Sequence, residues 1–252
     1  MCGRYELHSH PAAIALAFGL SLPPEIEPRY NIAPMQDVPI VRLRKEGTRE
    51  LAQARWGLVP RWAKDPSIGN KMINARGETL SEKPSFRMAF KHHRCLLPAN
   101  GFYEWKTSAA GGKQPIHIGM KDGAPFAFAG LFERWLSPDG RVLDTCTIAT
   151  TSANTLIAAL HDRMPVIIAP DQYERWLDVT QADVQDLLAP YPGDAMRWYP
   201  VSTRVNSVRN DDPALLVEIA EAVPANASAT SAPLPADSEP DSVNDPEQTQ
   251  LF

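Results

Sequence analysis

Residues 125–150, Pro-Phe-Ala-Phe-Ala-Gly-Leu-Phe-Glu-Arg-Trp-Leu-Ser-Pro-Asp-Gly-Arg-Val-Leu-Asp-Thr-Cys-Thr-Ile-Ala-Thr, place two apolar runs on either side of a turn. The runs 125–131 and 143–150 are rich in the aromatic and β-branched residues that favour strands. Between them, Asp139-Gly140 is a dipeptide typical of a tight hairpin turn. The stretch therefore predicts a β-hairpin and antiparallel pairing.

Further short strands and irregular helices surround this hairpin in the sequence. Six strand-like runs with helices scattered between them, and no alternation of strand and helix, predict an α+β fold. We expect a single domain with curved antiparallel β-sheets forming a partial barrel, flanked by short helices. The chain has no glycine-rich phosphate loop, so no nucleotide cofactor is expected. The other strand-like runs are 38–43, 94–97, 115–119 and 165–168, and the helical candidates are 11–19, 79–83 with 85–91, 152–161, 170–177 and 213–222.

Composition and cysteine content narrow the class of protein. With 252 residues, of which 44% are hydrophobic, the chain can bury a sizeable core. There is no secretory signal pattern and no run of 18 apolar residues, so we expect a cytoplasmic protein, associated with the nucleoid, and no membrane partner. Three scattered cysteines suit neither a disulfide framework nor a metal cluster. We expect Cys95 and Cys146, which lie in strand-like runs, to be reduced and buried.

The acidic net charge of −5 belongs to one end of the chain. Of the 30 acids, five lie in residues 224–252, a segment with no Lys or Arg, so residues 1–223 hold 25 acids and 25 bases. Residues 224–252 are mostly Pro, Ala, Ser, Asn, Asp and Glu, a composition typical of disorder. The sequence thus predicts a neutral domain over 1–223 and a disordered acidic tail over 224–252.

The second residue, Cys2, has a chemical property that depends on its position. Removal of Met1 would leave Cys2 with a free α-amine beside its thiol. These groups titrate near about 7.7–8.0 and about 8.5 respectively, so each is partly nucleophilic near neutral pH. The amine attacks an aldehyde to give a Schiff base, and the thiolate then closes a five-membered thiazolidine. The alternative is that Cys2 is an incidental cysteine.

Six short motifs carry polar residues that a hydrophobic core would not require. They are Met-Cys-Gly-Arg-Tyr at 1–5, Arg-Tyr-Asn-Ile-Ala-Pro at 29–34, Trp-Gly-Leu-Val-Pro-Arg-Trp at 56–62, Asn-Ala-Arg-Gly-Glu at 74–78, Gly-Phe-Tyr-Glu-Trp at 101–105 and His-Asp-Arg-Met-Pro at 161–165. In this set and order the motifs resemble the SRAP family, the SOS response-associated peptidase-like proteins, and the resemblance covers nearly all of residues 2–206. The family's pattern is met at every position that matters.

The resemblance implies recognition of abasic sites in single-stranded DNA and covalent capture of the lesion. An abasic deoxyribose opens to an aldehyde, which the Cys2 amine and thiol would convert to a thiazolidine crosslink. The Asn74 amide suits a hydrogen bond to the sugar or the N-terminus. Glu104 suits general acid–base catalysis of hemiaminal dehydration, and His161 suits protonation of the sugar oxygen or reversal of the crosslink. Each of these three also has a purely structural interpretation.

DNA binding requires cations for phosphates and flat surfaces for bases. Such contacts would make recognition nearly independent of sequence, and the resemblance implies a preference for single strands or single/double-strand junctions. We expect Trp56 to be a core residue. The candidates are Arg4, Arg76 and Arg163 for phosphates, Trp62, Trp105 and Pro60 as stacking or wedge residues, and Thr150 for a backbone phosphate.

The chain ends Gln248-Thr249-Gln250-Leu251-Phe252, with two apolar residues after a polar stretch. Gln248, Leu251 and Phe252 resemble the short motif by which bacterial repair proteins dock on the sliding clamp. The other histidines share no metal-ligand spacing, so neither a metal nor another cofactor is expected. A monomer is the default expectation.

Three other functions remain open. An amidotransferase with an N-terminal nucleophile would also begin Met-Cys-Gly, but it needs glutamine-binding motifs that are absent here. A peptidase would use Cys2 as nucleophile with Glu104 and His161 assisting, and could remove residues ahead of Cys2. A non-catalytic DNA-binding module would form no covalent product.

Overall fold

The computed structural model describes residues 2–107 and 112–220. Contacts divide the chain into two units, Met1–Glu221 and Ala222–Phe252. The acidic segment 224–252, with the predicted clamp motif of Gln248, Leu251 and Phe252, lies outside the described residues. No helix in the described part of the chain is long and apolar enough to cross a membrane.

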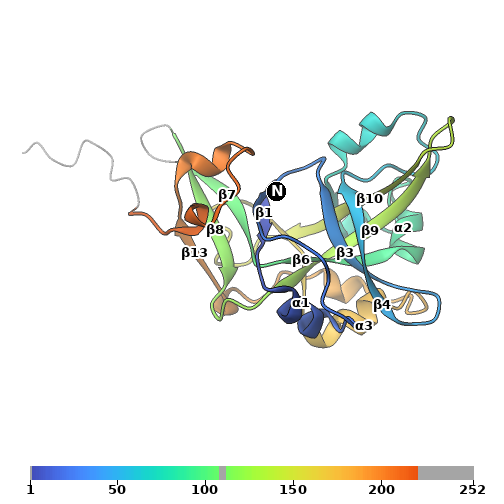
Figure 1. Cartoon of the computed structure of the whole chain (residues 1–252), viewed down its shortest axis with the longest axis horizontal. Helices are drawn as coiled ribbons and strands as arrows, with labels where there is room; N and C mark the ends of the chain where they lie inside the picture. The colour runs from blue at the N-terminus through green and yellow to red at the C-terminus, as the bar shows by residue number, and fades with distance from the viewer. Residues whose placement is uncertain (1, 108–111, 221–252) are drawn as a thin grey trace, which may run out of the picture. The chain divides into compact units, whose positions relative to one another are not determined.

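A closed ring of five strands forms the centre of the domain (Figure 1). Its strands are β10 (Val142–Ser152), β4 (Arg49–Trp56), β3 (Asp37–Leu43), β6 (Arg94–Ala99) and β9 (Phe126–Leu136), with β9 pairing back to β10. All neighbours are antiparallel except β4 and β10, which run parallel. The barrel that the sequence predicts is therefore present and closed.

The hairpin that joins β9 and β10 confirms the prediction from residues 125–150. Leu136 pairs with Val142, and the two strands continue antiparallel to the pair of Gly130 with Ile148. Gly140 has φ +83°, a left-handed conformation that glycine adopts without a steric penalty.

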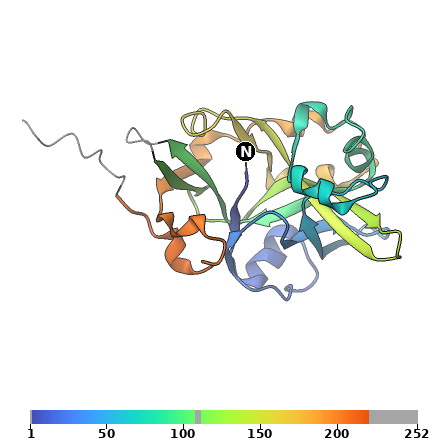
Figure 2. The same ribbon diagram turned by 90° about the horizontal axis from the view of Figure 1, so that it is seen from above.

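A second sheet of five antiparallel strands lies beside the barrel (Figures 1 and 2). Its order is β13 (Met196–Pro200), β8 (Lys113–Met120), β7 (Gly101–Thr107), β1 (Tyr5–Leu7) and β2 (Arg29–Ile32). Three further short strands join the barrel sheet, and the α-helices are short, so the α+β class is confirmed. The remaining elements are β5 (Asn74–Arg76), β11 (Arg163–Pro165), β12 (Ile167–Ile168), α1 (Pro11–Phe18), α2 (Arg87–His92) and α3 (Tyr173–Leu177), with 3₁₀ turns at Pro66–Lys71, Gly77–Thr79, Pro170–Gln172, Gln185–Leu188, Gly193–Ala195, Thr203–Asn206 and Pro213–Leu216.

Three predicted helical segments do not form as expected. The first, 79–83, consists of turns that follow the 3₁₀ turn Gly77–Thr79, so only its neighbour 85–91 contains an α-helix. The segment 152–161 is a series of turns, because the Asn154 side chain binds the backbone of Ile157 and Tyr191 at 2.9 and 2.7 Å instead of leaving a regular helix. Within 213–222, only Pro213–Leu216 is helical, and the chain then extends so that Glu218 bridges to Val201.

The N-terminal strand is fixed to the barrel by aromatic packing. Tyr5 of β1 meets Trp56 and Phe128 edge to face, with ring centroids 5.3 and 5.7 Å apart. All three side chains are completely buried, as are Cys95 and Cys146, which confirms the core prediction for these two cysteines and Trp56. Each aromatic pair is worth about 0.5–1.5 kcal/mol beyond the area that it buries. Position 2, three residues before Tyr5, is thereby held close to the barrel.

Candidate active site around the N-terminal cysteine

Cys2 lies just before β1 and is completely buried. Its Sγ is 3.8 Å from the backbone carbonyl of Arg4. Burial raises the pKa of the Cys2 thiol far above its ordinary value, and the nearby Glu104 carboxylate raises it further. The thiol is therefore protonated and neutral in this arrangement, which includes the peptide bond to Met1.

Asn74 reaches Cys2 from the neighbouring sheet. It begins β5, which pairs in parallel with β10 so that Asn74 faces Ile148 in the register. Its amide Nδ2 donates a hydrogen bond of 2.7 Å to the Cys2 carbonyl. The amide Oδ1 is buried and has no hydrogen-bond partner among the described residues. A buried acceptor without a partner costs free energy, so Oδ1 of Asn74 is available to accept a hydrogen bond from a donor that enters the site.

Glu104 supplies the carboxyl group of the site. It lies on β7, paired with Ile116 of β8, and is 5% exposed. Desolvation raises the pKa of the Glu104 carboxyl, and the nearby His161 opposes this shift. A carboxyl group with a raised pKa stays protonated at higher pH than usual, which suits it to donate a proton.

His161 follows the turns after β10 and its side chain is 33% exposed. Its Nδ1 is 2.9 Å from the backbone nitrogen of Arg163 and 2.7 Å from a carboxylate oxygen of Asp162. Neutral Nδ1 accepts from the backbone N–H, whereas protonated Nδ1 donates to Asp162. Because His161 also affects the pKa of Glu104, the structure brings Cys2, Asn74, Glu104 and His161 into one cluster.

The predicted phosphate ligands Arg76 and Arg163 flank this cluster on strands that pair with β10. Arg76 faces Thr150 in the register and is exposed. The Arg163 guanidinium forms a two-pronged ion pair with Glu78, with Nη2 at 2.9 Å from Oε2, and Nη2 also donates to the Thr150 carbonyl at 2.7 Å. Thr150 is completely buried, and its hydroxyl lies 3.4 Å from the Ala75 carbonyl.

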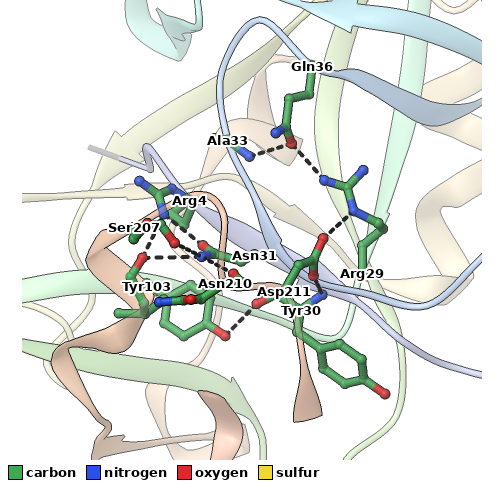
Figure 3. Close-up of polar contacts among 11 residues, drawn as sticks. Arg4, Arg29, Tyr30, Asn31, Ala33, Gln36, Tyr103, Ser207, Asn210 and Asp211 are labelled. Atoms are coloured by element: carbon green, nitrogen blue, oxygen red, sulfur yellow. Dashed lines mark hydrogen bonds and ion pairs between the residues drawn. The ribbon is translucent and has the colours of Figure 1, made fainter. Parts of the chain in front are cut away.

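Arg4 and Trp105 lie together on the outer face of the second sheet. The Arg4 guanidinium carbon is 5.9 Å from the centre of a Trp105 ring, within the range of a cation–π contact. Trp105 donates from Nε1 to the Asn206 side chain at 2.8 Å. Arg4 donates to Asn31 at 2.7 Å (Figure 3), so part of its guanidinium is committed to the protein.

Pro60 and Trp62 belong to a separate feature after β4. Trp62 is 60% exposed and, with the buried Pro60, lines a hollow of about 270 Å³ beside Met88 and His92 of α2. The contacts of the described residues do not connect this hollow to Cys2. The stacking and wedge roles of Pro60 and Trp62 remain predictions.

Two residues inside the quoted motifs received no role from the sequence. Glu78 closes Asn-Ala-Arg-Gly-Glu and holds Arg163, while Asn31 in Arg-Tyr-Asn-Ile-Ala-Pro holds Arg4. Their positions inside the motifs were the available signal, but the sequence did not identify their partners. Among residues 2–107 and 112–220, no cluster of three or more His, Cys, Asp or Glu is placed to hold a metal ion.

The Asn74 amide and the Glu104 carboxyl beside buried Cys2, with the His161 imidazole near Glu104, form a candidate site centred on this cysteine. Residues 1–208 match the family described as SOS response associated peptidase (SRAP). The chain belongs to this family, which confirms the resemblance drawn from the motifs.

Known relatives cover most of the chain. It is 46% identical to an abasic site processing protein, YoqW, of Bacillus subtilis over 86% of this chain and 99% of the relative. It is 30% identical to the abasic site processing protein YedK of Escherichia coli over 86% of this chain and 99% of the relative. A crystal structure from Bacteroides thetaiotaomicron matches with a TM-score of 0.78 and 26% identity, covering 87% of this chain and 100% of that one.

Proposed function

We propose that this protein captures abasic sites in single-stranded DNA through a covalent bond to Cys2, and thereby shields the lesion. The observation that carries the proposal is that Asn74 and Glu104 lie against buried Cys2, with His161 near Glu104. The names of the relatives, abasic site processing proteins, supply the substrate class.

The reaction begins once Met1 has been removed and Cys2 has a free amine. The amine adds to the C1′ aldehyde of the opened sugar, and the resulting carbinolamine loses its hydroxyl as water to give a Schiff base. The thiol sulfur then adds to the same carbon while its proton passes to nitrogen, which closes the thiazolidine. The product contains both partners minus one water, and no oxidant or reductant is needed.

Each neighbour has a role in this sequence. The Asn74 amide orients the Cys2 backbone, and its unpaired Oδ1 is available to accept from the Cys2 amine or a sugar hydroxyl. Glu104, whose raised pKa keeps it protonated to higher pH than an ordinary carboxyl, donates the proton that leaves with the carbinolamine hydroxyl. His161 protonates the sugar ring oxygen as the ring opens and, in reverse, assists release.

The DNA strand is held by its phosphates. Arg76 is exposed and ready for a phosphate, whereas Arg163 must exchange Glu78 for one. Arg4 and Trp105 are our further candidates for this path, whereas Thr150 is completely buried and would act through Arg163, which its carbonyl holds. Exposed Trp62 would meet the first base pair at a single/double-strand junction, while the buried Pro60 offers little surface to DNA.

A denaturing gel tests the proposal directly. Protein lacking Met1 is incubated with a single-stranded oligonucleotide that carries one abasic site, beside Cys2→Ala protein and an oligonucleotide with intact bases. We expect a heat-stable shifted band only with Cys2 and the abasic site, with a mass equal to both partners minus one water. No shifted band from fully processed protein would refute covalent capture.

A Cys2-dependent peptidase is the second candidate, favoured by the placement of Glu104 near the thiol, by that of His161 near Glu104, and by the family's description. It would act on the bond that precedes Cys2. Mass spectrometry of protein made with several residues ahead of Cys2 distinguishes it. Self-removal of these residues in wild type, and not in Glu104→Gln, would support peptidase activity.

We further propose that Gln248, Leu251 and Phe252 at the end of the acidic segment 224–252 bind the replication sliding clamp. The domain would act as a monomer in the cytoplasm, on the nucleoid. Deletion of Leu251 and Phe252 should abolish capture of the purified clamp, while crosslinking to abasic DNA continues. Equal clamp capture by the full and shortened chains would reject this motif.

A further inference from the structure

The segment 203–212 covers the outer face of the second sheet and is held there by one buried amide. Asn31 of β2 is completely buried. Its Nδ2 points at three backbone carbonyls, those of Val205 at 3.2 Å, Ser207 at 3.0 Å and Asn210 at 2.7 Å (Figure 3). Two amide hydrogens shared among three carbonyls fix both the side chain and the loop around it.

The other end of the same amide holds Arg4. Its Oδ1 accepts from Nη1 of Arg4 at 2.7 Å, and this Nη1 also donates to the Val205 carbonyl at 2.8 Å. An Nη nitrogen has two hydrogens, so Nη1 is fully committed to the protein. The Nε of Arg4 is buried and has no hydrogen-bond partner among the described residues. The anchored nitrogen thus sets the plane of a guanidinium that still has unused donors.

A second anchor holds the loop without touching Arg4. The Asp211 carboxylate accepts from Nε of Arg29 at 2.5 Å and from the Tyr30 backbone nitrogen at 2.5 Å. Nη2 of Arg29 also donates a hydrogen bond of 2.8 Å to Oε1 of Gln36. The loop is therefore attached at two points, Asn31 and Asp211, and Asp211 can be changed without removing a contact of Arg4.

We propose that Asn31 is a positioning residue that aims Arg4 at a DNA phosphate beside Cys2. The inference rests on the proposed function, in which Arg4 contacts the strand. A free arginine loses rotamer entropy when a ligand immobilises it. Arg4 has lost this freedom in advance through Asn31 and Val205, so its remaining donors meet a phosphate in a fixed direction.

Salt dependence separates positioning from folding. The probe is a single-stranded oligonucleotide with a tetrahydrofuran analogue of the abasic site, which has no aldehyde and binds without crosslinking. Anisotropy titrations over a range of NaCl concentrations are run for wild type, Arg4→Ala, Asn31→Ala, the double variant and Asp211→Asn. Loss of one phosphate contact lowers the slope of log affinity against log salt by about 0.7 on single strands.

We expect Arg4→Ala and Asn31→Ala each to lower the slope by about 0.7, and the double variant to lower it no further. At low salt, Asn31→Ala should bind roughly tenfold more weakly, the loss of one hydrogen bond to a charged group. Asp211→Asn weakens loop attachment alone and should keep the wild-type slope. If Asn31→Ala fails to fold, Asn31→Ser, whose hydroxyl is too short to reach Arg4, takes its place.

Three contrary results have different meanings. A wild-type slope for Asn31→Ala beside a lowered slope for Arg4→Ala overturns the positioning role and leaves the proposed function intact. A wild-type slope for Arg4→Ala removes Arg4 from the DNA contacts, and the inference fails together with that part of the proposed function. A lowered slope for Asp211→Asn would attribute the effect to the loop and also overturn the role of Asn31.

Discussion

Arg163 and Glu78 face each other as a two-pronged ion pair at the edge of the proposed DNA path, with Arg163 also bound to the Thr150 carbonyl. Arg163 is 16% exposed and Glu78 is 52% exposed, so the pair is open on the side of the carboxylate. The ion pair lowers the pKa of the Glu78 carboxyl, which keeps its negative charge at neutral pH. A phosphate that binds Arg163 must therefore compete with Glu78.

The first prediction concerns this competition. In Glu78→Gln the carboxylate charge is lost, so Arg163 becomes available and repulsion of the strand decreases. We expect noncovalent affinity for tetrahydrofuran-containing single strands to rise roughly threefold to tenfold at low salt, and the gain to shrink at high salt. Exposed Glu82→Gln is the control with the same charge change. Weaker binding by Glu78→Gln than by the control would show that Glu78 orients Arg163 rather than competing with DNA.

The second prediction concerns Asn74 and its hydrogen bond of 2.7 Å to the Cys2 carbonyl. Asn74→Ala removes that bond and leaves Cys2 free to turn away from Glu104. The loss of one hydrogen bond of about 1.5 kcal/mol corresponds to roughly tenfold slower crosslinking in a single-turnover gel assay. Exposed Asn70→Ala, a matched substitution four residues earlier, should react at the wild-type rate. Equal rates for both variants would exclude Asn74 from the reaction.

The third prediction is a pH dependence of crosslinking. The reaction needs the Cys2 amine deprotonated, with an ordinary pKa of about 7.7–8.0, and Glu104 protonated, with a pKa that burial raises. These opposite requirements make the profile of crosslinking rate against pH bell-shaped. In Glu104→Gln, the pH profile should lose the limb that is due to titration of Glu104. Crosslinking by this variant should be slower by roughly a hundredfold or more. An unchanged profile in this variant would assign the limb to another group.

The same carboxyl group gives a fourth prediction, on stability. Burial raises the folded-state pKa of Glu104 above its ordinary value of 4.5, so its contribution to stability is full below that value and is lost as pH rises through the folded pKa. Glu104→Gln should therefore melt at a higher temperature than wild type at pH 8 and at nearly the same temperature at pH 4. Each kcal/mol of difference corresponds to about 2–4 °C in a domain of this size. A constant difference across pH would contradict the burial effect.

The elements that the sequence predicted well are those with long apolar patterns. The hairpin of β9 and β10, and β3, β6 and β8, have enough residues for their pattern to identify a strand. By contrast, β1, β2 and β5 have three or four residues each, too few to show a period, and they exist because neighbouring strands pair with them. These short strands carry or adjoin Cys2, Asn31 and Asn74. The candidate site therefore lies on the strands that the sequence pattern is least able to predict.

The sequence identified the candidate residues by their motifs but could not predict which of them are in contact, because the contacts join residues that are far apart in the sequence. Asn74 meets Cys2 from 72 residues away, and Arg4 meets Val205 from 201 residues away. The periodicity of the sequence does not predict such long-range contacts. The sequence also predicted a helix over 152–161, where the Asn154 side chain forms hydrogen bonds with backbone groups and the chain forms turns instead.

The final prediction concerns Gly101, whose missing side chain leaves space for the buried side chains of His117 and Glu6. His117 of β8 approaches Gly101 of β7 so closely that an added Cβ would lie 2.3 Å from its Nε2 and 2.8 Å from a Glu6 carboxylate oxygen. Glu6 is 1% exposed, and hydrogen bonds from His117 and His8 keep the pKa of its carboxyl low although burial would raise it. Gly101→Ala must displace the imidazole or the carboxylate from this network.

We expect Gly101→Ala to cost about 1–3 kcal/mol or more of unfolding free energy, as for an overpacked core position. Differential scanning calorimetry should record a melting temperature lower by about 2–4 °C per kcal/mol. Gly112→Ala is the matched control, because its added Cβ meets no atom within 4 Å and its backbone is not left-handed. A Gly101→Ala protein as stable as the control would mean that β7 and β8 separate easily here, and that Glu6 and His117 do not constrain the strand that begins after Cys2.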